Sequence, residues 1–211
     1  MIFSDDIYFD RPNLYIGFHG CEKSVGMDLI LNPSRIHLSV RNYEWLGHGF
    51  YIWENNQERA LDWARNHYPK IKEPFAVGVV YTLEKCLDLT DKHFFWLLSE
   101  NYPEFIKDLK NLGASIPQNT DLNGKPNPNG VLRHLDCFLI EHFHSLNDLA
   151  EDIPYFDTVR GAFTEGKPAY PGTQFGDKNH IQVCIRNKKC IKGFFLPRCS
   201  FRKVFFSFGF M

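Results

Sequence analysis

The chain has 211 residues, of which 44% are hydrophobic and 16% aromatic, and its formal net charge is −1. This composition predicts a single globular domain over residues 1–211, and it excludes a disordered chain and a bulk electrostatic attraction to polyanions. The first residues contain no basic segment followed by an apolar run, and no apolar stretch reaches the ~18 residues that span a bilayer. We therefore expect a cytoplasmic protein with no membrane partner.

In chain order, the hydrophobic pattern first predicts a strand at 14–19 and a helix at 22–31. A half-buried strand follows at 36–40, where apolar and polar residues alternate. The next strand includes residues 50–53, and Asn55 or Asn56 caps a helix that ends before a proline at position 69.

The clearest strand of the chain covers 75–83, with a short continuation at 86–89. A helix capped by Thr90 or Asp91 runs to about residue 98, and a second helical piece covers about 103–112. Glycines and prolines predict a loop at 113–130, and helical spacing predicts a helix over 131–146.

The last third contains an irregular loop at 157–177, then two strands at 180–186 and 190–196 that we expect to form a hairpin. An aromatic strand at 201–210 is expected to close the sheet. Helices concentrated between the early strands and a hairpin near the end predict an α+β domain with a mixed sheet.

Six cysteines are dispersed along the chain: Cys21, Cys86, Cys137, Cys184, Cys190 and Cys199. They form no Cys-x-x-Cys pair, and their spacing to histidines does not resemble a zinc ligand set. Several lie within apolar strand or helix patterns, so we expect buried free thiols in a reducing compartment and no bound metal.

Two short segments share a pattern of histidine and glycine beside a strand. Residues 46–54 read Leu-Gly-His-Gly-Phe-Tyr-Ile-Trp-Glu, and residues 15–21 read Tyr-Ile-Gly-Phe-His-Gly-Cys. Glycine at such a place indicates a tight turn or a close approach of the backbone to another group. Either segment alone is compatible with a turn into a buried strand, but the pair favours a binding site.

Together with a late strand carrying His180-Ile-Gln182, these segments resemble the ADP-ribosyltransferase superfamily, in its diphtheria-toxin and poly(ADP-ribose) polymerase branch. The resemblance covers about 14–68 well and 157–196 loosely. It implies a split mixed β-sheet core with flanking helices, and NAD+ as the substrate. It also implies the branch's pattern of a His, a Tyr after Gly-x-Gly, and a later acidic residue.

The resemblance assigns roles to four residues near the two segments. His19 would hydrogen-bond the adenosine ribose hydroxyl, and Gly20 would offer its backbone N–H and C=O to the nicotinamide carboxamide. Tyr51 would stack on the nicotinamide ring, and Ser39 would assist at the ribose or amide. A satisfied strand-end histidine and a core tyrosine are the structural alternatives.

Gln182 stands where active members of the superfamily usually carry Glu. Its amide oxygen accepts a hydrogen bond but carries no charge to stabilise the oxocarbenium-like transition state. A missing stabilising group of this kind typically slows the reaction by ~10²–10³. Glu165, in the loop that lies over the acceptor site in the family, and Glu54 are candidate substitutes, with solvated or capping carboxylates as the alternative.

The helix after residue 54 lacks the Ser and the second stacking Tyr that the family often supplies there. Trp63 is the candidate for the second ring, and Arg59 is the candidate contact for the pyrophosphate. Arg160 is a further candidate for a phosphate or acceptor contact. A core tryptophan and surface arginines are the alternatives.

The resemblance therefore implies a mono-ADP-ribosyltransferase that moves ADP-ribose from NAD+ to a macromolecular acceptor, either a protein or a nucleic acid. Stand-alone bacterial members often act as toxins, with an antitoxin partner, or as phage-defence effectors. Two other readings stay open at this stage. One is a non-catalytic module that binds NAD+, ADP-ribose or a nucleic acid, and the other is an NAD+ glycohydrolase.

Overall fold

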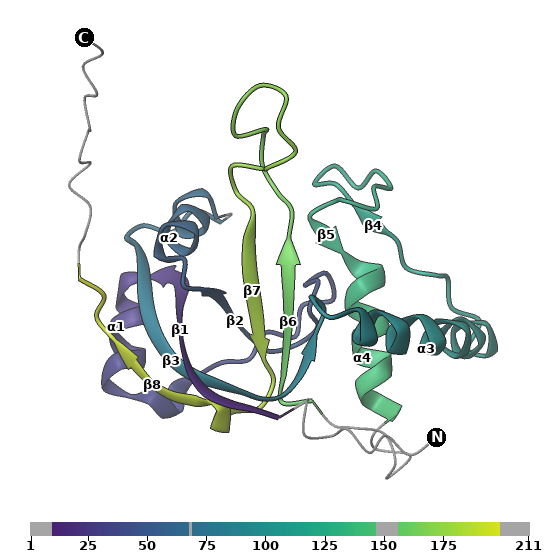
Figure 1. Cartoon of the computed structure of the whole chain (residues 1–211), viewed down its shortest axis with the longest axis horizontal. Helices are drawn as coiled ribbons and strands as arrows, with labels where there is room; N and C mark the ends of the chain where they lie inside the picture. The colour runs from purple at the N-terminus through teal and green to yellow at the C-terminus, as the bar shows by residue number, and fades with distance from the viewer. Residues whose placement is uncertain (1–9, 68, 147–155, 199–211) are drawn as a thin grey trace.

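The computed structural model describes residues 10–67, 69–146 and 156–198. Within these residues the strands are β1 (Asp10–Glu22), β2 (Phe50–Glu54), β3 (Pro74–Asp88), β4 (Asn119–Thr120), β5 (Leu132–Arg133), β6 (Thr158–Phe163), β7 (His180–Ile185) and β8 (Ile191–Phe195). The helices are α1 (Lys23–Leu31), α2 (Gln57–Asn66), α3 (Lys92–Asn111) and α4 (His134–Ser145). The expected α+β class with a mixed sheet and flanking helices is confirmed (Figure 1).

Six of the described strands form one sheet in the order β1-β2-β7-β6-β3-β8. Neighbouring strands are antiparallel except β3 and β6, which run parallel. Because β1 also pairs with β3 over most of its length, the sheet closes on itself into a small barrel, to which β8 adds through β3. The strands β4 and β5 form a separate two-stranded sheet.

The two sides of the sheet follow from the alternation of side chains along each strand. On β2, Phe50 and Ile52 belong to the cluster inside the barrel, together with side chains of β3 and β7 and with Leu29 of α1. Tyr51 and Trp53 point to the outer surface. The outer surface is covered in two places, by α2 over β1, β2 and β3 and by α3 and α4 over β6 and β7.

Local signals explain where the helices begin. The Asn56 side chain accepts a hydrogen bond from the Arg59 backbone N–H at 2.9 Å, which caps α2 as expected. Asp91 caps α3 by accepting from the His93 N–H at 2.9 Å. The two expected helical pieces at 91–98 and 103–112 are one helix, which continues through Pro103.

The expected strand at 36–40 is wrong. Only Ser39 forms a bridge there, with Gly49, after a 3-10 turn at Pro33–Arg35. The alternating pattern nevertheless identifies a buried residue, because Ile36 is buried in the cluster inside the barrel. Alternation thus located the buried residues without a pairing partner to make a strand.

Two expectations for the last third are also wrong. The segment 157–177 is not all loop, because its first part forms β6, which pairs with both β3 and β7. The strands β7 and β8 do not form a hairpin, since β8 pairs with β3 across the barrel. The hydrophobic pattern of a segment predicts a strand, but it does not predict which other strand it pairs with. The strand expected at 201–210 lies outside the described residues.

All five cysteines of the described residues are buried thiols, as expected: Cys21, Cys86, Cys137, Cys184 and Cys190. Burial raises the pKa of Cys21, Cys137 and Cys190 to about 12, which keeps these thiols protonated and unreactive. Cys199 lies outside the described residues. Within the described part of the chain, no helix combines the length and the apolar character needed to cross a membrane.

Candidate functional site

The two glycine-containing segments lie on neighbouring strands, at the place where these strands separate. The β1–β2 ladder consists of the pairs Gly17–Glu54 and Phe18–Trp53 and goes no further among the described residues. The next residue, His19, bridges the two strands with its side chain, because its Nδ1 lies 2.8 Å from the carbonyl oxygen of Tyr51. Beyond this contact the facing edges of β1 and β2 do not pair.

The protonation of His19 follows from this contact. A carbonyl oxygen only accepts, so Nδ1 carries the proton and donates it, and Nε2 keeps its lone pair. Burial lowers the pKa of His19 from its usual 6.5, so the ring is neutral at pH 7. The ring also stacks on Phe50, with centroids 4.4 Å apart and planes at 29°. His19 is therefore a fixed, neutral acceptor at the separated strand edges.

The hydroxyl of Tyr51 is used by the turn that precedes its own strand. It donates to the Gly47 carbonyl oxygen at 2.7 Å and accepts from the Leu46 N–H at 3.0 Å. Gly47 has a φ of 78°, a left-handed conformation that favours glycine. The turn thus explains Gly47 without a ligand, and the partly buried ring of Tyr51 packs against the cluster under α3 and α4.

Gly20 is required by the packing of α2. A Cβ atom at this position would lie 2.2 Å from the Ala60 carbonyl oxygen and 3.2 Å from the Trp63 ring. The backbone of α2 therefore rests on β1 at Gly20, and the structure brings Gly20 and Trp63 together. The same contact leaves no space for a ligand between Gly20 Cα and the helix.

Gln182 lies on β7 opposite Trp53, on the same outer side of the sheet as Tyr51. Its side chain is buried, and its Oε1 accepts a hydrogen bond from the Trp45 indole Nε1 at 2.6 Å. Since an indole N–H only donates, this contact fixes the orientation of the amide. The oxygen that would face a ribose cation is thus bound to Trp45, and the amide NH2 group remains as a donor.

Glu54 and Arg160 form a partly buried ion pair on the inner side of the sheet. The Arg160 Nε and Nη2 each lie 2.8 Å from one carboxylate oxygen of Glu54, and Nη1 lies 3.2 Å from an Asp88 oxygen. Hydrogen bonds to Glu54 raise the pKa of Arg160 above its usual value. Arg160 pairs with Val183, which faces the interior, so Glu54 and Arg160 lie on the opposite side of the sheet from Gln182.

Glu165 and Arg59 join the loop after β6 to α2. The Glu165 carboxylate lies 2.5 Å from Arg59 Nη2, and Asp62 lies 3.3 Å from Nη1 of the same guanidinium. The guanidinium carbon also lies 5.8 Å from the centre of the Trp53 ring. The Arg59 guanidinium thus pairs with the carboxylates of Glu165 and Asp62, and this ion pair holds Glu165 at α2.

Ser39 supports the entry to β2. Its backbone N–H donates to the Gly49 carbonyl oxygen at 2.8 Å, and the Gly49 N–H donates back at 3.0 Å. Its side chain hydrogen-bonds Glu44, a carboxyl group whose pKa is raised by burial. Ser39 therefore anchors the turn that presents Tyr51.

Two residues that the sequence analysis did not assign are central to this region. Trp53, 3% exposed, lies between Trp63 and His180, with ring centres 5.7 and 6.1 Å away. Strand alternation two residues after Tyr51 could have placed it on the same side. Trp45 lies in a loop without periodicity, so no sequence signal linked it to Gln182.

Among the described residues, no group of three or more His, Cys, Asp and Glu side chains could hold a metal ion. Comparison of the chain with protein-family models, with curated proteins and with solved structures finds no match. The site must therefore be judged on its own geometry.

Proposed function

We propose that this chain is an ADP-ribosyltransferase-like domain, and that it binds NAD+ where β1 and β2 separate. The main support for this proposal is that the β1–β2 ladder stops at Phe18–Trp53, directly before His19 and Gly20 and beside Tyr51. Backbone groups at an unpaired strand edge must find other partners. The nicotinamide carboxamide, with one acceptor and two donors, suits such an edge at Gly20.

The protonation of His19 supports this binding mode. With Nδ1–H bound to the Tyr51 carbonyl, Nε2 accepts a hydrogen bond, and a ribose hydroxyl supplies one. Tyr51 and Trp63 each offer a flat ring on the outer side of the sheet, Tyr51 beside the cluster under α3 and α4 and Trp63 beside the cluster under α2, and we assign the nicotinamide to the ring of Tyr51. Arg59 lies on α2 as the candidate contact for the pyrophosphate.

The proposed reaction breaks the bond between the nicotinamide nitrogen and the ribose C1′, and the electron pair leaves with nicotinamide. A nucleophile of a protein or nucleic-acid acceptor then bonds to C1′ and loses its proton to water. In this proposal Gln182 takes the place of the family's acidic residue, but its neutral amide stabilises the cation less than a carboxylate would. We therefore expect turnover slower by ~10²–10³ than an enzyme with the acid in place.

The test is incubation of the purified protein with NAD+ labelled on the adenylate, in the presence of cell lysate. We expect nicotinamide release and label in a macromolecular fraction, and strong loss of both in Tyr51→Ala and Gln182→Ala. Protease and nuclease treatment of separate portions identifies the acceptor class. Label found only in free ADP-ribose would indicate NAD+ glycohydrolysis, and absence of both products would overturn the enzymatic proposal.

A second candidate function is a non-catalytic NAD+ or ADP-ribose-binding module. It is favoured by the partners of the acidic groups, because Glu54 binds Arg160, Glu165 binds Arg59, and Trp45 occupies the Gln182 oxygen. The Gln182→Glu variant separates the two functions. A gain in nicotinamide release supports the transferase, whereas unchanged NAD+ binding without turnover in both proteins supports the module.

A further inference from the structure

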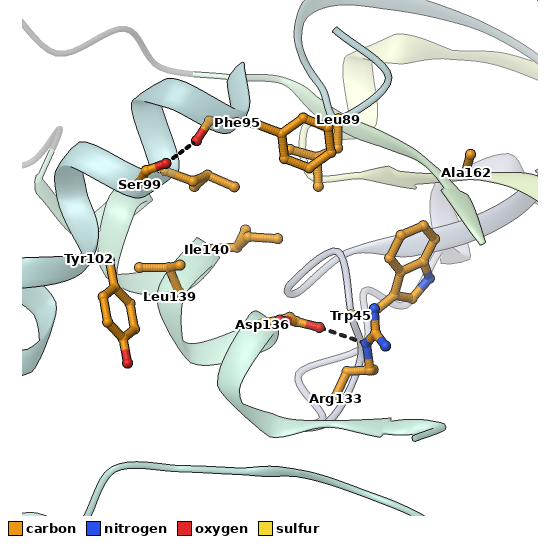
Figure 2. A pocket seen from close by; sticks show the side chains of 11 residues that line it. Trp45, Leu89, Phe95, Ser99, Tyr102, Arg133, Asp136, Leu139, Ile140 and Ala162 are labelled. Carbon is orange, nitrogen blue, oxygen red and sulfur yellow. Dashed lines mark hydrogen bonds and ion pairs between the residues drawn. The ribbon is translucent and has the colours of Figure 1, made fainter. Parts of the chain in front are cut away.

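A cavity of about 540 Å³ lies on the other part of the outer surface, between α3, α4 and the end of β6. Figure 2 shows its walls, with Phe95 and Leu89 on one side, Ile140 and Leu139 on another, and Trp45 beside Arg133 and Asp136. This volume falls in the range of ~300–1,000 Å³ that is usual for small-molecule sites. The cavity is thus large enough for a compact organic molecule.

The walls are mostly apolar, and several are flat. Trp45, Phe95 and Tyr102 present aromatic rings, and the rest of the wall is largely aliphatic. Phe95 is 54% exposed and Tyr102 is 38% exposed, which is unusual for large apolar side chains that line one hollow. Aromatic walls favour a planar ring, because stacked or edge-to-face contacts add to the burial of apolar surface.

The charged part of the wall is one ion pair, and Ser99 and Tyr102 add hydroxyl groups. The Arg133 Nε lies 2.6 Å from Asp136 Oδ2, although the N–H direction is poor for a hydrogen bond, so this buried N–H group is not satisfied. Asn119 donates to the same Asp136 oxygen at 3.0 Å. The Arg133 Nη1 donates to the Pro128 carbonyl oxygen at 2.8 Å. The pair carries no net charge, and the remaining guanidinium N–H groups lie beside the Asp136 carboxylate.

This arrangement selects against several ligand classes. A hydrocarbon would cover the guanidinium and carboxylate without replacing their hydrogen bonds to water, which is costly. A charged ligand would be attracted by one of the two groups and repelled by the other, so the pair offers no net attraction to offset the desolvation of a charge. A neutral planar heterocycle with a donor next to an acceptor satisfies both groups and stacks on the rings.

We propose that this cavity is a binding site for a neutral, planar heteroaromatic ring of about nucleobase size that carries adjacent hydrogen-bond donor and acceptor atoms. The ring lies among Trp45, Phe95 and Tyr102, and its polar edge faces Arg133 and Asp136. The site is separate from the NAD+ site proposed above and does not depend on it. It touches that site through Trp45, which lines the cavity and donates to Gln182.

The test uses 7-azaindole, a neutral bicycle with an N–H donor beside a nitrogen acceptor, and indene, which has the same size and neither group. Binding is followed by NMR of the tryptophan Nε1–H signals, with the Trp45 signal assigned from Trp45→Phe. We expect saturable binding of 7-azaindole that shifts the Trp45 signal, and indene binding weaker by about tenfold, as the loss of hydrogen bonds to charged groups implies.

Two matched variants locate the site. Ser99 lines the cavity and Glu100 is its exposed neighbour on α3, outside the lining, so Ser99→Trp should abolish binding and Glu100→Trp should not. Asp136→Asn should weaken 7-azaindole and leave indene unchanged, with the unfolding midpoint as a check on folding. The proposal is overturned if 7-azaindole does not bind, if Ser99→Trp still binds it, or if indene binds equally well.

Discussion

The two covered parts of the barrel's outer surface are packed in different ways. Under α2, the helix backbone rests on Gly20, where even a methyl group would lie 2.2 Å from the Ala60 carbonyl oxygen. Under α3 and α4, the side chains leave a cavity of about 540 Å³. Gly20 thus lies in the closely packed part, whereas Trp45, the hydrogen-bond partner of Gln182, lines the cavity. A glycine in a sequence motif can therefore be required by tight packing as well as by ligand binding.

The largest expected effect tests the close packing under α2. Gly20→Ala should lower the free energy of unfolding by about 3 kcal/mol, because backbone and not a flexible side chain blocks the added methyl group. Urea denaturation measures the change. Gly193→Ala on β8 is the matched control, since a Cβ there meets nothing within 4 Å, and equal effects of the two substitutions would contradict the packing difference.

A pH titration addresses the α3–α4 side, where His144 of α4 is buried. Burial, with a further contribution from Arg186, lowers the pKa of His144 to about 4, while Glu141 and a hydrogen bond to the Ile140 carbonyl act in the opposite direction. Below pH 6.5 the unfolded chain binds a proton at this residue that the folded chain does not. Stability is therefore full above pH 6.5 and falls as the pH decreases toward 4.

The size of this effect follows from the difference between pKa values of 6.5 and about 4, at ~1.36 kcal/mol per unit, which gives up to ~3 kcal/mol. Replacing His144 by Phe should remove this part of the pH dependence. The measurement is the unfolding free energy of both proteins at pH 7 and pH 4.5. A pH profile that is the same in the variant would show that His144 does not titrate as described.

An intermediate effect is expected where the loop after β6 joins α2. Arg59→Met and Glu165→Gln, alone and together, form a double-mutant cycle, and the partly buried pair should show a coupling of about 1 kcal/mol. The exposed pair Lys107–Glu104 on α3 is the control and should show no measurable coupling. Absence of coupling for the first pair would mean that the loop is not held at α2.

The smallest effect is expected from enlarging a side chain on the cavity wall. Leu139→Phe adds volume where space exists, so the unfolding free energy should change by no more than about 0.5 kcal/mol. Ala60→Leu, at a fully buried position under α2, should cost about 2 kcal/mol. Thermal unfolding of the two variants compares the packing directly, and a similar loss in both would indicate that the cavity is closed in solution.

The early elements were predictable because their signals are local. Alternation and glycine positions located β1 and β2, and Asn56 and Asp91 act as caps where the sequence placed them. Strand partners were not predictable in the same way. The pairing of β8 with β3 joins residues more than a hundred positions apart, and no local pattern encodes it.

The candidate site shows the same division. Strand alternation placed Tyr51 and predicted the strand of Gln182, but the partners of these side chains lie elsewhere in the chain. Trp45 and Gln182 are 137 residues apart, and Arg160 and Glu54 are 106 apart. Whether an acidic residue is available for chemistry depends on such contacts, so the sequence named Glu54 and Glu165 as candidates without showing that arginines bind both.

The most direct measurement of the central proposal is calorimetric titration of NAD+ into the unmodified protein, Tyr51→Ala and Ser99→Trp. Binding where β1 and β2 separate predicts one site per chain in the unmodified protein, loss of binding in Tyr51→Ala with its fold retained, and unchanged affinity in Ser99→Trp. Absence of binding to the unmodified protein would contradict the proposal. So would binding that survives in Tyr51→Ala and disappears in Ser99→Trp, because NAD+ would then occupy the cavity under α3 and α4.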